Sequence, residues 1–411
     1  MQTDVFTYLD QSPSPRGHDA VMSPARGELA GKSFTIQPNM SVRGWPTDAG
    51  SVALKGFVAL EDATVVERLQ KAGATLAGSS RMSELGLGLA KDTTGRILSE
   101  GRSEMAVMTD MMGEARIAAA RSGAFAFKPS NGIVSRFGLI GLAPSLETYA
   151  ILGRAPEDLA TVMGIIAGDD DRDFSMHGGR MPLFDQVAAA ARSMKTIGVV
   201  RKCVEIMDEA ENRAFRRGLE KLRSSGCNVK EVDLPDYDLF RTVHHVIGAV
   251  EASSSCGKYD GVRYGHRTAS AKNWNDMYLK TRAESFGALV KAYLFQGAYF
   301  QFENYAAFDN AGRIRNRLAQ GINGLFAGVD ALAFPTRRSG DRDQQTAGIE
   351  ELYDAFVQTL PANVTGVPAV QIPGYCTDGA TDYGLQLFGP RLSDASLLAL
   401  AVRLSQTSQG V

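Results

Sequence analysis

The feature that most constrains the fold of this 411-residue chain is the alternation of amphipathic helical segments with short apolar segments. The clearest unit is EDATVVERLQKAGATLAGS, residues 61–79. We expect Asp62 to cap a helix whose Val65, Val66 and Leu69 share one face, and Gly73 to end it before a buried strand.

The same alternation continues along the chain. Helices are predicted over 155–168 and 211–226, and strands over 32–40, 196–200, 328–336 and 368–374. Strands separated by helices favour an α/β fold with a mixed central sheet covered by helices on both faces. We expect an irregular segment over 1–30. No internal repeat interrupts the pattern after it, so we expect one domain over 31–411.

Composition and charge exclude several classes of protein. The net charge of −2 gives no reason to expect binding to a nucleic-acid backbone or an acidic membrane. No apolar run approaches the roughly 20 residues that a membrane span needs. The four cysteines are widely spaced, which indicates reduced thiols and a cytoplasmic protein. From the charge and the lack of a long apolar run, we expect no contact with membranes.

Three stretches together resemble the amidase-signature enzymes: EDATVVERLQKAGATLAGSSRMSELGLG (61–88), FAFKPSNGIVSRFGLIGLAPSLET (125–148) and EASSSCGKYDGVRYGHR (251–267). The third is similar to one branch, the glutaminase subunits of the glutamyl-tRNA(Gln)/aspartyl-tRNA(Asn) amidotransferases. Further matches follow in the same order: FGALVKAYLFQGAY (286–299), DALAFPT (330–336), TLPANVTGVPAVQIPG (359–374) and GLQLFGP (384–390).

The resemblance implies a single amidase-signature domain that hydrolyses C–N bonds without a metal or cofactor. Its catalytic unit is a Ser-Ser-Lys triad, in which a neutral lysine takes the proton, a serine on a cis peptide relays it, and a second serine attacks the amide. Backbone N–H groups beside the nucleophile hold the oxyanion. The resemblance also implies a partner similar to the B or C subunit of the amidotransferase, with tRNA bound only indirectly.

The motifs depart from this chemistry at the base and the nucleophile. The lysine motif matches FTIQPN, so Gln37 stands at the position of the base, and an amide cannot accept the proton. The nucleophile motif matches DMMGEAR, which keeps Asp110, Gly113 and Arg116 but has Glu114 at the serine position. A structural role for Glu114 at the N-terminus of a helix is therefore expected.

The loop that carries the relay serine is shortened to LSEGRSE, residues 98–104. Ser99 is the best match for the relay serine and Ser103 the second. Turn roles for both serines are the alternative.

The substrate-binding positions also differ. Ala292 and Tyr293 stand where the branch has arginines, and Phe356 stands near its aspartate. We expect Tyr293 and Phe356 to crowd a glutamine-sized pocket. The stretch YDGVRYG leaves two interpretations open: Tyr259, Asp260, Arg263 and Tyr264 line a cavity, or they form a buried polar network.

Three hypotheses of function follow. The first is a pseudoenzyme, a non-hydrolytic scaffold or regulatory subunit resembling the glutaminase subunit. The second is an amidase with a rebuilt site that uses Ser99, Ser103 or Glu114. The third is a working structural counterpart of the glutaminase subunit in an aminoacyl-tRNA amidotransferase, with ammonia supplied from elsewhere.

Overall fold

The computed structural model describes residues 5–9, 27–176, 178–179, 181–187, 194–336, 348–373 and 384–406. Within these residues, eleven strands form one mixed sheet in the order β1-β3-β2-β4-β6-β5-β10-β11-β9-β7-β8. The strands are β1 (Phe6–Leu9), β2 (Ser33–Ile36), β3 (Thr75–Ser80), β4 (Met105–Asp110), β5 (Phe125–Lys128), β6 (Thr148–Gly153), β7 (Thr196–Val200), β8 (Asn228–Val232), β9 (Ala331–Thr336), β10 (Ala369–Ile372) and β11 (Gly384–Phe388).

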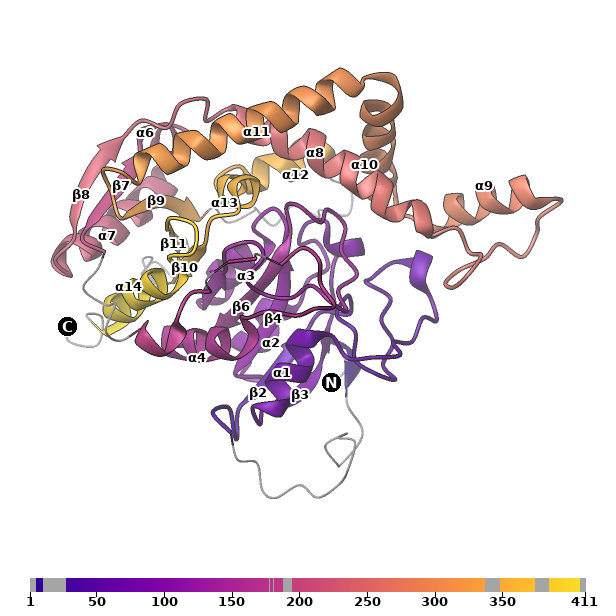
Figure 1. The fold of residues 1–411 in the computed structure, drawn as a ribbon, viewed down its shortest axis with the longest axis horizontal. Helices are drawn as coiled ribbons and strands as arrows, with labels where there is room; N and C mark the ends of the chain where they lie inside the picture. Colours follow the sequence, from indigo (N-terminus) through magenta and orange to yellow (C-terminus); the bar gives the residue numbers. More distant parts are fainter. Residues whose placement is uncertain are drawn as a thin grey trace.

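Helices cover both faces of this sheet, as the alternation of elements predicts (Figure 1). One face carries α2 (Thr94–Ser99), α3 (Glu114–Ser122), α8 (Leu239–Ser255), α10 (Ala288–Ala298), α11 (Tyr305–Leu325), α12 (Ile349–Phe356) and α13 (Leu360–Thr365). The other carries α1 (Thr64–Lys71), α4 (Pro156–Ile166), α7 (Glu209–Ser224) and α14 (Asp394–Gln406). The remaining α-helices among the described residues are α6 (Arg201–Glu205) and α9 (Trp274–Ser285), and α9 projects from the body in Figure 1.

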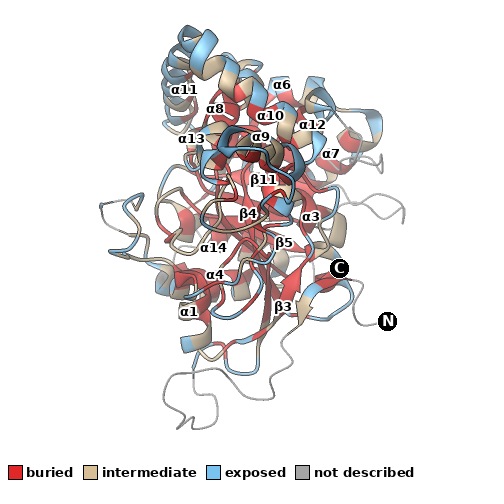
Figure 2. Ribbon diagram, turned by 90° about the vertical axis from the view of Figure 1, so that its right-hand side faces the viewer, coloured by how far each residue is buried: buried red, intermediate tan, exposed pale blue. Residues whose placement is uncertain are grey.

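The two hydrophobic cores follow from the alternation of side chains along each strand. In β4, Ala106 and Met108 belong to the core under α3 and α8, whereas Met105 and Val107 belong to the core under α1 and α4. Figure 2 shows that the buried residues are concentrated in the sheet and the helix faces against it. Every central strand is therefore buried on both faces, which explains its continuous apolar sequence.

Two local predictions are wrong. Residues 6–9 are not irregular, because β1 pairs antiparallel with β3 at the edge of the sheet. Asp62 does not cap α1, which has Ala63 at its N-cap; the Asp62 carboxylate accepts a hydrogen bond from the backbone N–H of Arg43 instead. The rest of the predicted 1–30 segment lies largely outside the described residues.

The cysteines agree with the predicted reduced state as far as they are described. Cys203, Cys227 and Cys256 are free and buried, and Cys376 lies outside the described residues. No helix among the described residues is both long enough and apolar enough to cross a bilayer.

Candidate functional site

Gln37 lies directly after β2, where Pro38 ends the strand, and only 3% of it is exposed. Its Oε1 accepts hydrogen bonds from the backbone N–H of Thr109 at 2.9 Å and from the Thr109 hydroxyl at 3.0 Å. Its Nε2 donates to Asp92 Oδ2 at 2.7 Å. Both ends of the amide therefore have protein partners, and neither atom is a base.

Asp92 is a neighbour of Gln37 that the sequence motifs do not reveal. Besides the bond from Gln37, its carboxylate accepts the backbone N–H of Thr94 at 2.9 Å at the start of α2. Burial raises the pKa of Asp92, although the hydrogen bonds from Gln37 and Thr94 oppose this. The sequence signal is weak, because an aspartate two residues before a helical segment is most often a capping residue.

The turn between β4 and α3 requires a glycine at position 113. Gly113 has a φ of +120°, which side chains rarely adopt, and a Cβ built there would lie 2.2 Å from Thr359 Oγ1. The positive φ and the close approach of Thr359 do not depend on which residue follows the glycine. They therefore require Gly113 in DMMGEAR even though Glu114 comes next.

Glu114 is the first residue of α3, and its carboxylate folds back onto the turn before it. Its Oε2 accepts hydrogen bonds from the backbone N–H groups of Met111 at 2.8 Å, Met112 at 2.7 Å and Gly113 at 3.1 Å. Three converging N–H groups at a helix N-terminus form an anion-binding site. The side chain of Glu114 occupies this site itself.

Burial is the largest influence on the pKa of Glu114, because only 2% of this residue is exposed. Burial, together with the nearby charge of Asp110, raises the pKa of Glu114 to about 7 against the opposing effect of the backbone hydrogen bonds. Its second oxygen, Oε1, has no hydrogen-bond partner within the described part of the chain. The Glu114 carboxylate thus binds the N-terminus of its own helix through one oxygen.

Asp110 and Arg116 form a buried ion pair that fixes the turn. Arg116 Nη2 lies 2.9 Å from Asp110 Oδ1, and both side chains are fully buried. Arg116 Nη1 also donates to the Thr359 carbonyl at 3.0 Å and to Gln386 Oε1 at 2.9 Å. Burial favours the neutral acid, but the charge and hydrogen bonds of Arg116 outweigh it and hold the pKa of Asp110 below its usual value.

Gln37 and Glu114 therefore lie at one site. Thr109, which binds Gln37, is two residues before Met111, which binds Glu114. Two residues of extended chain span about 7 Å, so with these two hydrogen bonds the carboxamide and carboxylate oxygens are no more than about 13 Å apart. The two motif positions therefore belong to one hydrogen-bonded group.

The two candidate serines do not join this hydrogen-bonded group. Ser99 is exposed at the end of α2, and its hydroxyl donates to the Arg96 carbonyl at 3.1 Å. Ser103 is buried, and its hydroxyl donates to the Met105 carbonyl at 2.7 Å. Both hydroxyls donate to nearby backbone carbonyls, which is typical of the turn residues of the alternative interpretation. The side chain that is hydrogen-bonded to Gln37 Nε2 is Asp92.

Two of the three predicted substrate-binding positions lie in the protein core. Tyr293 and Phe356 are fully buried. Met111 contributes a carbonyl that can only accept, so His244 Nε2 donates to it at 2.9 Å and His244 Nδ1 accepts from the Tyr353 hydroxyl at 2.9 Å. Tyr353 in turn accepts from Tyr293 at 3.0 Å. Burial lowers the pKa of His244 to about 4, so the chain of bonds holds a neutral imidazole.

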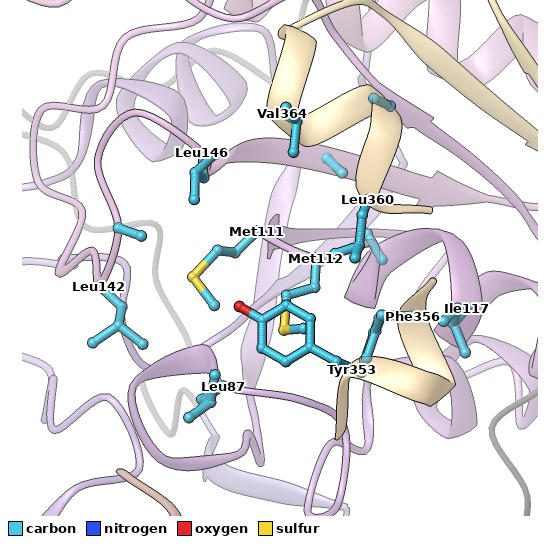
Figure 3. Close-up of a cluster of buried hydrophobic side chains, with 14 of the residues drawn as sticks. Leu87, Met111, Met112, Ile117, Leu142, Leu146, Tyr353, Phe356, Leu360 and Val364 are labelled. Carbon is cyan, nitrogen blue, oxygen red and sulfur yellow. The ribbon is translucent and has the colours of Figure 1, made fainter. Parts of the chain in front are cut away.

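Apolar side chains fill the space around this chain of hydrogen bonds. Figure 3 shows the methionines of the β4–α3 turn packed against residues of α12, α13 and the loops. The cluster includes Leu87, Met111, Met112, Ile117, Leu142, Leu146, Tyr353, Phe356, Leu360 and Val364. Tyr293 and Phe356 thus do more than crowd a pocket, because both are part of a packed core; the exposed Ala292 lies outside that core.

The YDGVRYG stretch makes mainly structural contacts. Asp260 accepts the backbone N–H of Val262 at 2.9 Å in a turn, and the Tyr259 and Tyr264 rings meet edge to face. Arg263 is exposed. These contacts favour a role in holding the fold over a role in lining a cavity.

Metal chemistry has no candidate site in the described ranges, which contain no group of three or more His, Cys, Asp or Glu residues placed to hold an ion.

The fold and the matched sequence together define the family. The family model described as Amidase matches residues 15–96 and 94–398. This chain belongs to the amidase family, the amidase-signature enzymes.

Within the family, the chain is similar to proteins named as the A subunit of glutamyl-tRNA(Gln) amidotransferase. It is 32% identical to that of Natronomonas pharaonis over 401 residues, covering 90% of this chain and 94% of the relative. It is 31% identical to that of Synechococcus elongatus over 407 residues, covering 93% and 85%.

Solved structures show the same fold. The A subunit of glutamyl-tRNA(Gln) amidotransferase from Thermotoga maritima superposes with a TM-score of 0.77 at 22% identity, covering 97% of this chain and 86% of that one. The peptide amidase from Stenotrophomonas maltophilia gives a TM-score of 0.75 at 22% identity, covering 93% and 84%. The predicted α/β fold with a mixed sheet is therefore confirmed.

Proposed function

We propose that this protein is a non-hydrolytic member of the amidase family, a binding subunit that keeps the fold of the glutaminase subunit without its amidase chemistry. The observation that carries the proposal is the position of Glu114. Its carboxylate accepts the three N–H groups of the β4–α3 turn, the groups that in an amidase would stabilise the oxyanion.

The residues at the other catalytic positions support the same conclusion. Gln37 offers an amide where the resemblance implies a lysine base, and both ends of that amide are hydrogen-bonded. The Ser99 and Ser103 hydroxyls bind backbone carbonyls and have no hydrogen-bonded base among the described residues. Loss of a nucleophile alone typically lowers turnover by about 10⁶, and these parts act as a unit.

The test is hydrolysis of glutamine, asparagine and simple amides by the purified protein, measured as ammonia release. We expect no turnover above that of a Glu114→Gln variant purified in the same way, which controls for contaminating amidases. Turnover that disappears in Ser99→Ala or Ser103→Ala would establish an amidase with a rebuilt site and overturn the proposal.

A surface of exposed aromatic residues favours a protein partner. Phe295 of α10, Tyr299 and Phe302 of the π-helix η5 (Tyr299–Glu303), and Tyr305 of α11 are between 52% and 75% exposed. Phe295 and Tyr299 are four residues apart at the end of α10, a spacing that places them on one side of an α-helix, and Phe302 follows in the π-helix. We call these four residues the 295–305 aromatic surface.

Aromatic side chains exposed in a group are typical of protein interfaces. The relatives at 31–32% identity are named as subunits of a multisubunit amidotransferase. We therefore infer that the 295–305 aromatic surface binds a protein similar to the B or C subunit of the amidotransferase, with tRNA contacted only through that partner.

Affinity purification from the native cell tests the partner. We expect recovery of a homologue of the B or C subunit, and a loss of at least about tenfold in its yield with Phe295→Ser/Phe302→Ser, since buried aromatic anchors dominate interface energies. The matched control is Trp274→Ser/Leu279→Ser, which removes two exposed apolar side chains from α9. Recovery of the wild-type protein alone and monomeric would refute the partner.

A further inference from the structure

A cavity of about 1090 Å³ lies beside the Gln37 end of the site, away from the Glu114 carboxylate. Its walls come from β1, from residues 48–55 and from residues 81–96. Asp92 lines this cavity and also accepts the hydrogen bond from Gln37. The cavity is therefore adjacent to the site described above but has its own lining.

Positive charge in the cavity wall exceeds negative charge. Lys55, Arg81 and Lys91 line it, and their side chains make no hydrogen bond or ion pair within the described parts of the chain. The wall also contains two acids: Asp48 accepts a backbone N–H at 2.9 Å, and Asp92 accepts hydrogen bonds from Gln37 and Thr94. The cations Lys55, Arg81 and Lys91 outnumber these two carboxylates, so the net charge of the wall is positive.

The same wall has an apolar part. Phe6 and Tyr8 of β1 contribute aromatic side chains, together with Val52 and Met82. The Tyr8 ring is held against Trp45 with ring centroids 4.6 Å apart. A ligand that matched this wall would combine a negative group with a ring or short alkyl chain.

We propose that this cavity binds a small organic anion, a phosphate or carboxylate attached to an apolar ring or chain. The three cations Lys55, Arg81 and Lys91 bind the anionic group, and the β1 side chains pack against the apolar part. Arg96 also lines the cavity but already pairs with Glu100 at 2.7 Å, so it is left out of the test.

The experiment titrates the full chain with phenyl phosphate, benzoate and the neutral benzyl alcohol, using ligand-observed NMR. For ligands this small we expect dissociation constants in the millimolar range for the better of the two anions, and at least tenfold weaker binding of benzyl alcohol. The two anions distinguish a phosphate site from a carboxylate site. Binding of the anion should weaken with added salt, because the cations are exposed to solvent.

The triple variant Lys55→Ala/Arg81→Ala/Lys91→Ala should weaken anion binding by about tenfold or more while the thermal unfolding midpoint stays unchanged. A matched control, Lys230→Ala/Arg223→Ala/Lys272→Ala, removes the same residue types from exposed positions outside the cavity and should leave binding unchanged. Equal loss in both variants, or no binding of either anion up to about 20 mM, would overturn the proposal.

Discussion

The stability of the protein should depend on pH through Glu114, and the substitution Glu114→Gln isolates this dependence. The pKa of Glu114 is about 7 in the folded protein against 4.5 ordinarily. As the pH rises from about 4.5 to about 7, the unfolded chain loses this proton while the folded protein keeps it. The contribution of Glu114 to the free energy of unfolding therefore falls between about pH 4.5 and about pH 7. The total fall is about 3 kcal/mol, at 1.36 kcal/mol per pKa unit.

Glutamine has nearly the same shape, offers an amide oxygen to the three N–H groups and does not ionise. The free energy of unfolding of the variant minus that of the wild type should therefore rise by about 2–3 kcal/mol between about pH 5 and about pH 8.5. Urea denaturation at several pH values measures this difference. Other titrating groups, such as Lys128, affect both proteins and largely cancel.

Asp170→Asn is the matched control, since Asp170 is also a largely buried carboxylate. Burial acts to raise its pKa, but hydrogen bonds from Thr64, Ser135 and Arg172 outweigh burial and hold the pKa far below its usual value. The stabilisation that such a group contributes is fully present above the pKa of its unfolded state. The free energy of unfolding of Asp170→Asn minus that of the wild type should therefore stay constant from about pH 5 upward. A flat difference for Glu114→Gln, or one that falls with pH, would show that the N–H groups outweigh burial and would refute the reasoning.

Two further substitutions test the turn that holds Glu114. Gly113→Ala places a Cβ 2.2 Å from Thr359 Oγ1 at a φ of +120°, so we expect a loss of at least about 2 kcal/mol in urea denaturation. Gly123→Ala, with a φ of +64° and nothing within 4 Å, should cost only about 1 kcal/mol, and equal losses would contradict the steric argument. Arg116→Met leaves Asp110 charged and buried and should cost about 3–5 kcal/mol by the same measurement. Adding Asp110→Asn should recover part of that loss; no recovery would mean that packing, rather than the unpaired charge, sets the cost.

Much of the fold is predictable from the sequence because it rests on strong local patterns. The helix–strand unit over 61–79 has an apolar face and a terminal glycine, and the structure has α1 and β3 there. β1 escapes prediction because its four residues pair with β3, some 70 residues away, and its own sequence carries little signal.

The candidate site is predictable where a motif fixes the register and not elsewhere. Glu114 stands directly beside Gly113, a motif residue that this chain keeps, and Gln37 lies within the FTIQPN match. The structure brings the two residues to one site. The shortened loop has no such anchor, so the sequence favours Ser99 and gives little sign of Asp92. The hydrogen bonds from the turn to Glu114 depend on the rotamer of Glu114 and on tertiary packing. The spacing of the motif residues in the sequence does not encode either of these.

The hydrogen bond between Gln37 and Asp92 has a consequence for the evolutionary reversibility of the site. A lysine restored at position 37 would meet the Asp92 carboxylate at hydrogen-bonding distance, and that charge would hold it as an ammonium instead of a neutral base. A serine restored at position 114 would free the backbone N–H groups but would have no proton acceptor. On the proposed non-hydrolytic function, neither change alone would create amidase activity, and hydrolysis would need coordinated changes at positions 37, 92 and 114.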